Sequence, residues 1–186
     1  MTLDLPVGPI ARKLPSEPHF AIWTMLESVT DPEIPVVNLR EMGILRAVRQ
    51  SSGALEVVIT PTYSGCPALG QMTDDVVQAL AQAGVAARVL TQIAPAWSTD
   101  WISAEGCEKL RRYGIAPPLP GAGASGALKA IQFAAKSIAG SAMLTVACPQ
   151  CGSHNTTETS HFGSTACKAL YRCLNCLEPF DYFKPY

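Results

Sequence analysis

The feature that most constrains this chain is a pair of Cys-x-x-Cys motifs near its C-terminus. Cys148 and Cys151 form the first motif, Cys173 and Cys176 form the second, and 21 residues separate the two. Each motif makes a tight turn whose two sulfur atoms converge on one ion, and two such turns provide a tetrahedral set of four thiolates. The spacing therefore predicts a metal-bound ribbon, with zinc as the expected ion and iron as the alternative.

The predicted ion is structural, because a metal with four cysteine ligands keeps no open position for water or substrate. A segment of about 40 residues cannot bury a sufficient core alone, and a bound metal would let it fold. The seven cysteines of the chain are an odd number, which argues against a disulfide framework. The chain opens without a secretory signal and contains no apolar stretch of membrane-spanning length, so we expect a cytoplasmic protein with no membrane partner.

The charge balance of the chain disfavours partners that are recognised by electrostatic attraction. The sequence has 14 basic and 15 acidic residues, a net charge of −1. Within the ribbon, the basic residues Lys168, Arg172 and Lys184 are balanced by Glu158, Glu178 and Asp181. Because no basic stripe is present, we expect no nucleic-acid partner.

Residues 16–118 are predicted to form one α+β domain with the order helix, β-hairpin, helix, strand, helix. The periodicity and turn residues place these elements in a helix beginning at Ser16, strands over 44–49 and 55–60, a helix over 69–83, a strand over 85–94 and a helix over 103–113. Residues 119–140 are predicted to be a linker that includes a short helix over 128–139. Residues 141–186 are predicted to be the ribbon module.

Cys66 is the candidate functional thiol of the first domain. It lies just before Pro67 and the predicted helix over 69–83, where free N–H groups and the helix dipole would favour a thiolate. Asp31 and Glu33 lie in a loop made rigid by two prolines. If that loop folds over Cys66, a carboxylate could join the thiolate as a hard ligand for iron; a capped, solvated turn is the alternative.

Two further cysteines lie outside the paired motifs. Cys107 falls within the predicted helix over 103–113 and is expected to be a packing residue. Cys167 lies in the ribbon six residues before Cys173. It is expected to be a small core or turn residue, with a role in redox chemistry or as a secondary ligand as the alternative.

Taken together, these motifs resemble the small domain shared by SufT and related iron–sulfur assembly factors, followed by the zinc ribbon of the PaaD family. The residues that carry the resemblance are 31–39 (DPEIPVVNL), 42–45 (MGIL), 60–68 (TPTYSGCPA), 97–103 (WSTDWIS), 109–118 (KLRRYGIAPP), 148–153 (CPQCGS), 162–173 (FGSTACKALYRC) and 178–184 (EPFDYFK). The resemblance covers nearly all of residues 18–186.

The resemblance implies a role in aerobic phenylacetate degradation. PaaD-like proteins are encoded with a multicomponent di-iron epoxidase of phenylacetyl-CoA, which is fed by a reductase with flavin and a [2Fe–2S] cluster. They are thought to mature a metal centre of that system. Carried over by position, Cys66 and the loop with Asp31 and Glu33 would form the functional face, and Cys66 would be a transient ligand of an iron–sulfur cluster.

Two functional hypotheses follow, and neither makes the chain catalytic by itself. In the first, the protein is an assembly factor that hands iron or a cluster to an epoxidase component. A single cysteine cannot hold a cluster, so a homodimer or a partner would complete the site. In the second, the protein is a stable, non-catalytic subunit of the oxygenase complex. Glu-x-x-His occurs once, at Glu158 and His161 in the predicted ribbon, whereas a di-iron site needs such pairs on two helices. The one GxGxxG stretch, residues 121–126, lies in the predicted linker and not between a strand and a helix, so a dinucleotide-binding enzyme is also disfavoured.

Overall fold

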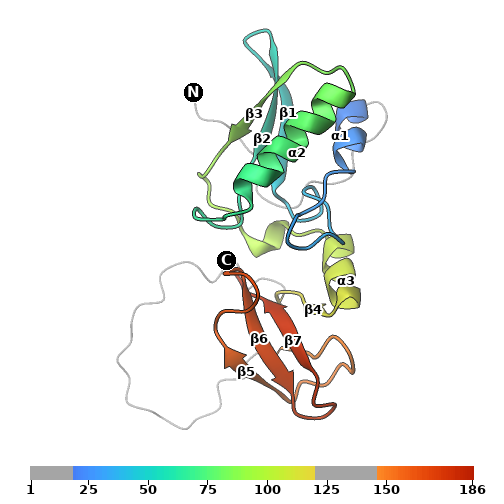
Figure 1. The fold of residues 1–186 in the computed structure, drawn as a ribbon, viewed down its shortest axis with the longest axis vertical. Helices are drawn as coiled ribbons and strands as arrows, with labels where there is room; N and C mark the ends of the chain where they lie inside the picture. Colours follow the sequence, from blue (N-terminus) through green and yellow to red (C-terminus); the bar gives the residue numbers. More distant parts are fainter. Residues whose placement is uncertain (1–18, 120–145) are drawn as a thin grey trace.

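The computed structural model describes residues 19–119 and 146–186 of the chain (Figure 1). The described elements follow in the order α1 (Phe20–Leu26), β1 (Leu45–Ser51), β2 (Ala54–Ile59), α2 (Leu69–Gln82), β3 (Ala87–Thr91), η1 (Thr99–Trp101), α3 (Ala104–Tyr113), β4 (Ile115–Ala116), β5 (Thr156–Ser160), β6 (Lys168–Cys173) and β7 (Pro179–Phe183). The expected α+β class and its element order are confirmed. The predicted helix over 128–139 and most of the predicted linker lie outside the described residues.

The first domain is a three-stranded sheet covered by helices. The sheet has the order β1-β2-β3, with β1 and β2 antiparallel and β2 and β3 parallel. The hairpin turns through Ser52 and Gly53, both with positive φ. A two-residue turn that matches the twist of the strands requires this conformation at both positions. Helix α2 provides the crossover to β3 and lies across one face of the sheet (Figure 1). It buries one stripe at helical spacing, formed by Met72, Val76 and Leu80.

Helix α3 begins and ends where its terminal residues dictate. The hydroxyl of Ser103 accepts a hydrogen bond from the Gly106 N–H at 3.0 Å, which satisfies one free donor of the first turn. Gly114, with φ of 95°, closes the helix in the left-handed conformation that glycine tolerates best. The chain then enters β4 directly.

The C-terminal sheet has four strands in the order β4-β7-β6-β5. Strand β4 pairs in parallel with β7, joining Ile115 to Asp181 and Ala116 to Tyr182. The residues that follow α3 therefore form one edge of the sheet that carries the cysteine motifs, and the two halves of the chain are connected by strand pairing.

The hydrophobic core also crosses between the two halves. One buried cluster contains residues of α1, the hairpin and α2 together with Ile115, Cys167 and Phe183. Trp97 packs against Phe183 with ring centroids 5.9 Å apart, and its indole N–H donates to the Met42 carbonyl at 3.0 Å. A second, smaller cluster lies within the C-terminal sheet. The end of β7 is thus part of the core of the first domain.

Among the described residues, no helix combines the length and the hydropathy that crossing a membrane would require.

Candidate functional site

The four paired cysteines come together in space. Their sulfur atoms, from Cys148, Cys151, Cys173 and Cys176, all lie within 4.8 Å of one another. Sγ of Cys148 is 3.7 Å from that of Cys176, and Sγ of Cys151 is 3.6 Å from that of Cys173. The edge of a tetrahedron with metal–sulfur bonds of 2.3 Å is about 3.8 Å. Two of the separations match that edge, and all four thiols lie close enough together to bind one tetrahedral metal ion.

Local backbone geometry favours the thiolate form at one of these four residues, Cys173. The Cys176 N–H donates to Cys173 Sγ at 3.5 Å, and such hydrogen bonds lower the pKa of Cys173, favouring the thiolate form that binds metal. Gly152, directly after Cys151, has φ of 73° and lets the first turn close. Cys148 and Cys173 are buried in the core of the C-terminal sheet. The site is closed on that side, as in structural metal sites.

The loop that carries Asp31 and Glu33 is held rigid by its own backbone. An isolated β-bridge joins Thr30 to Asn38 at the ends of the loop. The Asp31 carboxylate accepts hydrogen bonds from the N–H groups of Glu33 at 2.7 Å and Ile34 at 3.0 Å. Ile34 is buried and anchors the loop in the core. Asp31 is thus a buried turn-forming residue, and Glu33 is a half-buried residue that it positions.

Cys66 lies in the turn between β2 and α2. Its N–H donates to the Tyr63 carbonyl at 3.2 Å, and its carbonyl accepts from the Leu69 N–H at 3.3 Å. The side chain is half-buried against the core of the first domain. Because α2 begins at Leu69, Cys66 lies three residues before the helix.

The charge environment of Cys66 differs from the expected one. Burial raises the pKa of Cys66, a hydrogen bond from the Ala68 backbone lowers it, and the negative charges of Glu33 and Asp31 raise it further. The expectation that the helix end would favour a thiolate is therefore wrong: the helix contribution is present, but burial and the neighbouring carboxylates exceed it. The carboxylates of Asp31 and Glu33 therefore lie within electrostatic range of Cys66.

The remaining cysteines occupy different environments. Cys107 is half-buried on α3 and packs against the core, as expected, and burial is the cause that raises its pKa. Cys167 is buried, and Thr165 Oγ1 lies 3.0 Å from its sulfur. Negative charges on Glu33 and Asp31 act on Cys167 as they do on Cys66. This electrostatic influence was not predicted from the sequence, because it depends on packing between the two halves of the chain.

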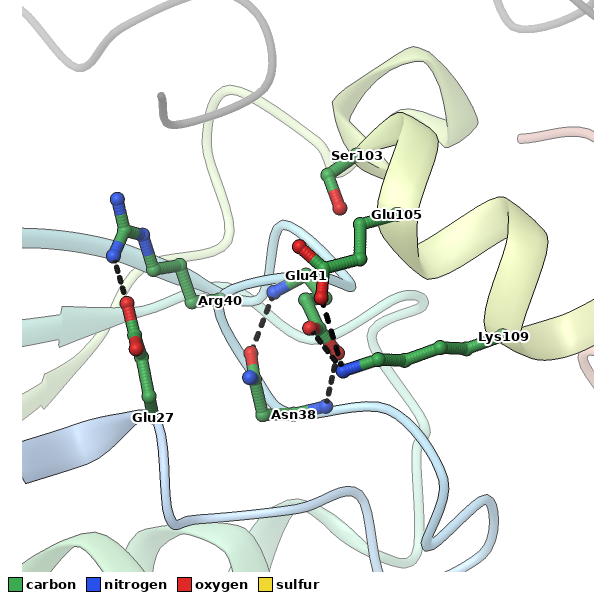
Figure 2. A pocket seen from close by; sticks show the side chains of 7 residues that line it. All are labelled: Glu27, Asn38, Arg40, Glu41, Ser103, Glu105 and Lys109. Atoms are coloured by element: carbon green, nitrogen blue, oxygen red, sulfur yellow. Dashed lines mark hydrogen bonds and ion pairs between the residues drawn. The ribbon is translucent and has the colours of Figure 1, made fainter. Parts of the chain in front are cut away.

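A polar pocket lies elsewhere on the first domain, between α1, the loop before β1 and α3 (Figure 2). Lys109 Nζ is 2.5 Å from one Glu41 carboxylate oxygen and 3.5 Å from Glu105. Arg40 pairs with Glu27, and Asn38 and Glu41 exchange hydrogen bonds between side chain and backbone. These groups satisfy one another and hold α3 against the loop, so the pocket is explained by structural ion pairs.

Comparisons with known proteins match two parts of the chain to known families. Residues 20–90 match the family described as iron–sulfur cluster assembly protein, and residues 133–184 match the PaaD zinc beta ribbon domain. The chain is 42% identical over 176 residues to a protein of Escherichia coli (strain K12) that is named as a subunit of "Putative 1,2-phenylacetyl-CoA epoxidase", covering 94% of this chain and 97% of that one.

Two solved structures are similar to part of the chain. A domain of unknown function from Bacillus anthracis is 28% identical, with a TM-score of 0.43, covering 46% of this chain and 84% of that chain. A conserved hypothetical protein from Thermotoga maritima is 23% identical, with a TM-score of 0.42, covering 54% and 98%.

The 42% identity extends over both modules, across nearly the whole length of each protein. With an iron–sulfur cluster assembly domain followed by a PaaD zinc ribbon, the chain belongs to the PaaD family, which includes this Escherichia coli epoxidase subunit.

Proposed function

We propose that this protein is an accessory factor that matures a phenylacetyl-CoA epoxidase by delivering iron or an iron–sulfur cluster to one of its components. The observation that carries the proposal is the match of residues 20–90, which include Cys66, Asp31 and Glu33, to the iron–sulfur cluster assembly family. The name of the Escherichia coli relative supplies the client system.

The chemistry of the group suits transient iron binding. A thiolate is a soft ligand and a carboxylate is a hard one, and together they suit ferrous iron. The raised pKa of Cys66 means that the thiol is protonated at neutral pH until a cation displaces the proton. A site that must compete with its own protons binds iron reversibly, as a donor of iron requires.

We assign zinc to the four-cysteine site and a structural role to that ion. The closed shell of four thiolates leaves no position for substrate, and the matched family is described as a zinc ribbon. Metal analysis of the purified protein should find about one zinc per chain, retained in Cys66→Ser and lost in Cys148→Ser.

The proposal is tested in cells that express the epoxidase with this protein or one of its variants as the sole copy. The oxygenase and reductase components are then purified, and their iron, acid-labile sulfide and epoxidase activity are measured. Cys66→Ser should leave at least one component deficient in iron and activity, whereas Cys107→Ser, which alters a half-buried packing thiol, should not. Full maturation with Cys66→Ser would overturn the proposal.

A second function is favoured by one observation, the word "subunit" in the name of the relative. In that case the protein would be a stable, non-catalytic member of the oxygenase complex. Affinity purification of the tagged protein distinguishes the two: a fixed stoichiometry with the oxygenase that survives Cys66→Ser supports a stable subunit, and a transient complex supports the accessory factor.

A further inference from the structure

Tyr186 makes contacts with both modules of the chain. It lies three residues after the end of β7, and its ring stacks on that of Tyr63, with centroids 6.4 Å apart and an interplanar angle of 17°. Its hydroxyl donates to the carbonyl of Ala166, in the ribbon module, at 3.2 Å. Its backbone oxygen accepts from the N–H of Thr99, in the first domain, at 3.2 Å. One side chain thus joins a ring of the first domain to a turn of the ribbon module.

The ring of Tyr63 belongs to the turn that carries Cys66. The Tyr63 carbonyl accepts from the Cys66 N–H at 3.2 Å, and the Cys66 carbonyl accepts from the Leu69 N–H at 3.3 Å. Both Tyr63 and Cys66 are half-buried and pack against the core of the first domain. A turn at the edge of a core opens more readily than the buried strands do. The stacking of Tyr63 on Tyr186 therefore helps to fix the conformation in which Cys66 is presented.

The ribbon module holds Tyr186 from the other side. Lys184, directly after β7, donates its backbone N–H to the carbonyl of Cys167 at 3.0 Å. Strand β7 pairs with β6, and β6 ends at Cys173, one of the four cysteines that lie together. The backbone that leads to Tyr186 is therefore continuous with the strands that a metal ion at those cysteines would stabilise.

We propose that Tyr186 is a positioning residue for Cys66: its ring holds the turn of Cys66 through Tyr63, and its hydroxyl fixes that ring to the ribbon module. The inference rests on the proposed function, which makes Cys66 the ligand of iron in transit. A ligand held in one conformation binds its ion without first ordering the chain, whereas a loose turn loses binding free energy to that ordering. The ribbon module thus acts on the site of iron delivery through this tyrosine.

Two substitutions separate the contacts of the side chain. Tyr186→Leu removes the ring and the hydroxyl but keeps an apolar side chain, whereas Tyr186→Phe keeps the ring and removes only the hydroxyl. Tyr186 is half-buried and borders a surface hollow with Ile93 and Ala96, so we expect both variants to fold. Tyr113→Leu, at a tyrosine of α3 that is 54% exposed, is the matched control.

The measurement is amide hydrogen–deuterium exchange of the zinc-loaded full chain, read on peptides by mass spectrometry and compared with exchange in α2. Tyr186→Leu should speed exchange in residues 60–68 by about two- to tenfold, as expected for loss of a stacked aromatic pair. Tyr186→Phe should leave residues 60–68 at the wild-type rate, and it should speed exchange in residues 163–168 by about two- to tenfold through the lost hydrogen bond. Tyr113→Leu should match wild type in both segments.

Maturation in cells shows whether the position of the turn matters for delivery. With Tyr186→Leu as the sole copy, the iron content and activity of the epoxidase component should fall by about two- to tenfold. Tyr186→Phe should restore most of both. Rescue by this conservative variant identifies the ring, and not the hydroxyl, as the group that acts on Cys66.

The outcomes separate this inference from the proposed function. Exchange in residues 60–68 that is unchanged in Tyr186→Leu, or raised equally in Tyr186→Phe, overturns the positioning role and leaves the proposed function standing. A loosened turn with full maturation by Tyr186→Leu overturns its part in delivery. Full maturation by Cys66→Ser overturns the proposed function, and the exchange rates still decide whether Tyr186 holds the turn.

A second variant guards against a Tyr186→Leu chain that fails to fold, which raised exchange in α2 would reveal. Tyr63→Leu removes the other ring of the stack and leaves the hydroxyl of Tyr186 in place. It should speed exchange in residues 60–68 by the same factor and leave residues 163–168 at the wild-type rate. Unchanged exchange in residues 60–68 would contradict the positioning role.

Discussion

At the scale of single residues, the sulfur of Cys66 is governed by opposing influences. Burial and the carboxylates of Glu33 and Asp31 hold the thiol in its protonated form, while a hydrogen bond from the start of α2 acts in the opposite direction. A thiol in this balance is unreactive until a metal ion or a change of charge favours the thiolate. Under the proposed function, we therefore expect Cys66 to serve as a metal ligand and not as a nucleophile.

The substitution Glu33→Gln tests this balance directly. Removing the negative charge lowers the pKa of Cys66, so at pH 8 a larger fraction is thiolate and alkylation by iodoacetamide accelerates by about two- to fivefold. Peptide mapping by mass spectrometry measures the rate at each cysteine. Cys107, whose pKa is raised by burial, provides the internal reference. An unchanged ratio between the two rates would show that Glu33 does not act on Cys66.

Gly43 is a second residue whose identity is dictated by its surroundings. It has φ of 66°, and a Cβ atom there would lie 2.6 Å from both Cβ and the carbonyl oxygen of Trp101. Gly43→Ala should lower the free energy of unfolding by about 2–4 kcal/mol, from the strained φ and the overlap together. Gly53, with φ of 80° and nothing within 4 Å of its Cβ position, is the matched control.

Gly53→Ala isolates the conformational cost and should lower the free energy of unfolding by about 1 kcal/mol. Urea denaturation measures both values. Equal losses for the two substitutions would mean that the contact with Trp101 is relieved at no cost.

At the scale of elements, the periodicity of the sequence predicted the helices and strands that depend on residues close together in the chain. The stripe of α2, the two-residue turn after β1 and the caps of α3 depend on residues a few positions apart, and the expected helix-hairpin-helix-strand-helix order is confirmed. The sequence did not reveal β4, because two residues carry no period and its pairing depends on a distant strand. For the same reason it did not reveal that Cys167, a residue of the C-terminal module, is buried in the core of the first domain.

The end of β7 is the element through which the two modules share a core. Phe183 is 1% exposed and packs on Trp97, so Phe183→Ala should lower the free energy of unfolding by about 3–5 kcal/mol. Phe162, in the same module, is 65% exposed, and Phe162→Ala should change the free energy of unfolding by no more than about 0.5 kcal/mol. Urea denaturation, monitored by far-UV circular dichroism, compares the two variants. Similar small losses would show that β7 does not support the first domain.

At the scale of the whole molecule, strand pairing and a shared core couple the metal site to the first domain. The three tryptophans of the chain, Trp23, Trp97 and Trp101, all lie in the first domain, so tryptophan fluorescence reports on that domain. Removing the metal with a chelator under reducing conditions should lower the Tm of the fluorescence transition by about 5–10 °C. Added zinc should restore it. A fluorescence transition unaffected by the chelator would mean that the modules fold independently.

The molecule is thus assigned two metal roles, a structural ion in the ribbon and iron in transit at Cys66, and the second is the central claim. The most direct measurement is transfer in vitro. Protein loaded anaerobically with ferrous iron is mixed with iron-depleted epoxidase component, in the presence of a chelator that captures free iron, and the recovery of activity is followed. We predict recovery with wild type and with Cys107→Ser, and none with Cys66→Ser. Equal recovery with Cys66→Ser, or no recovery with wild type above the chelator control, would contradict the claim.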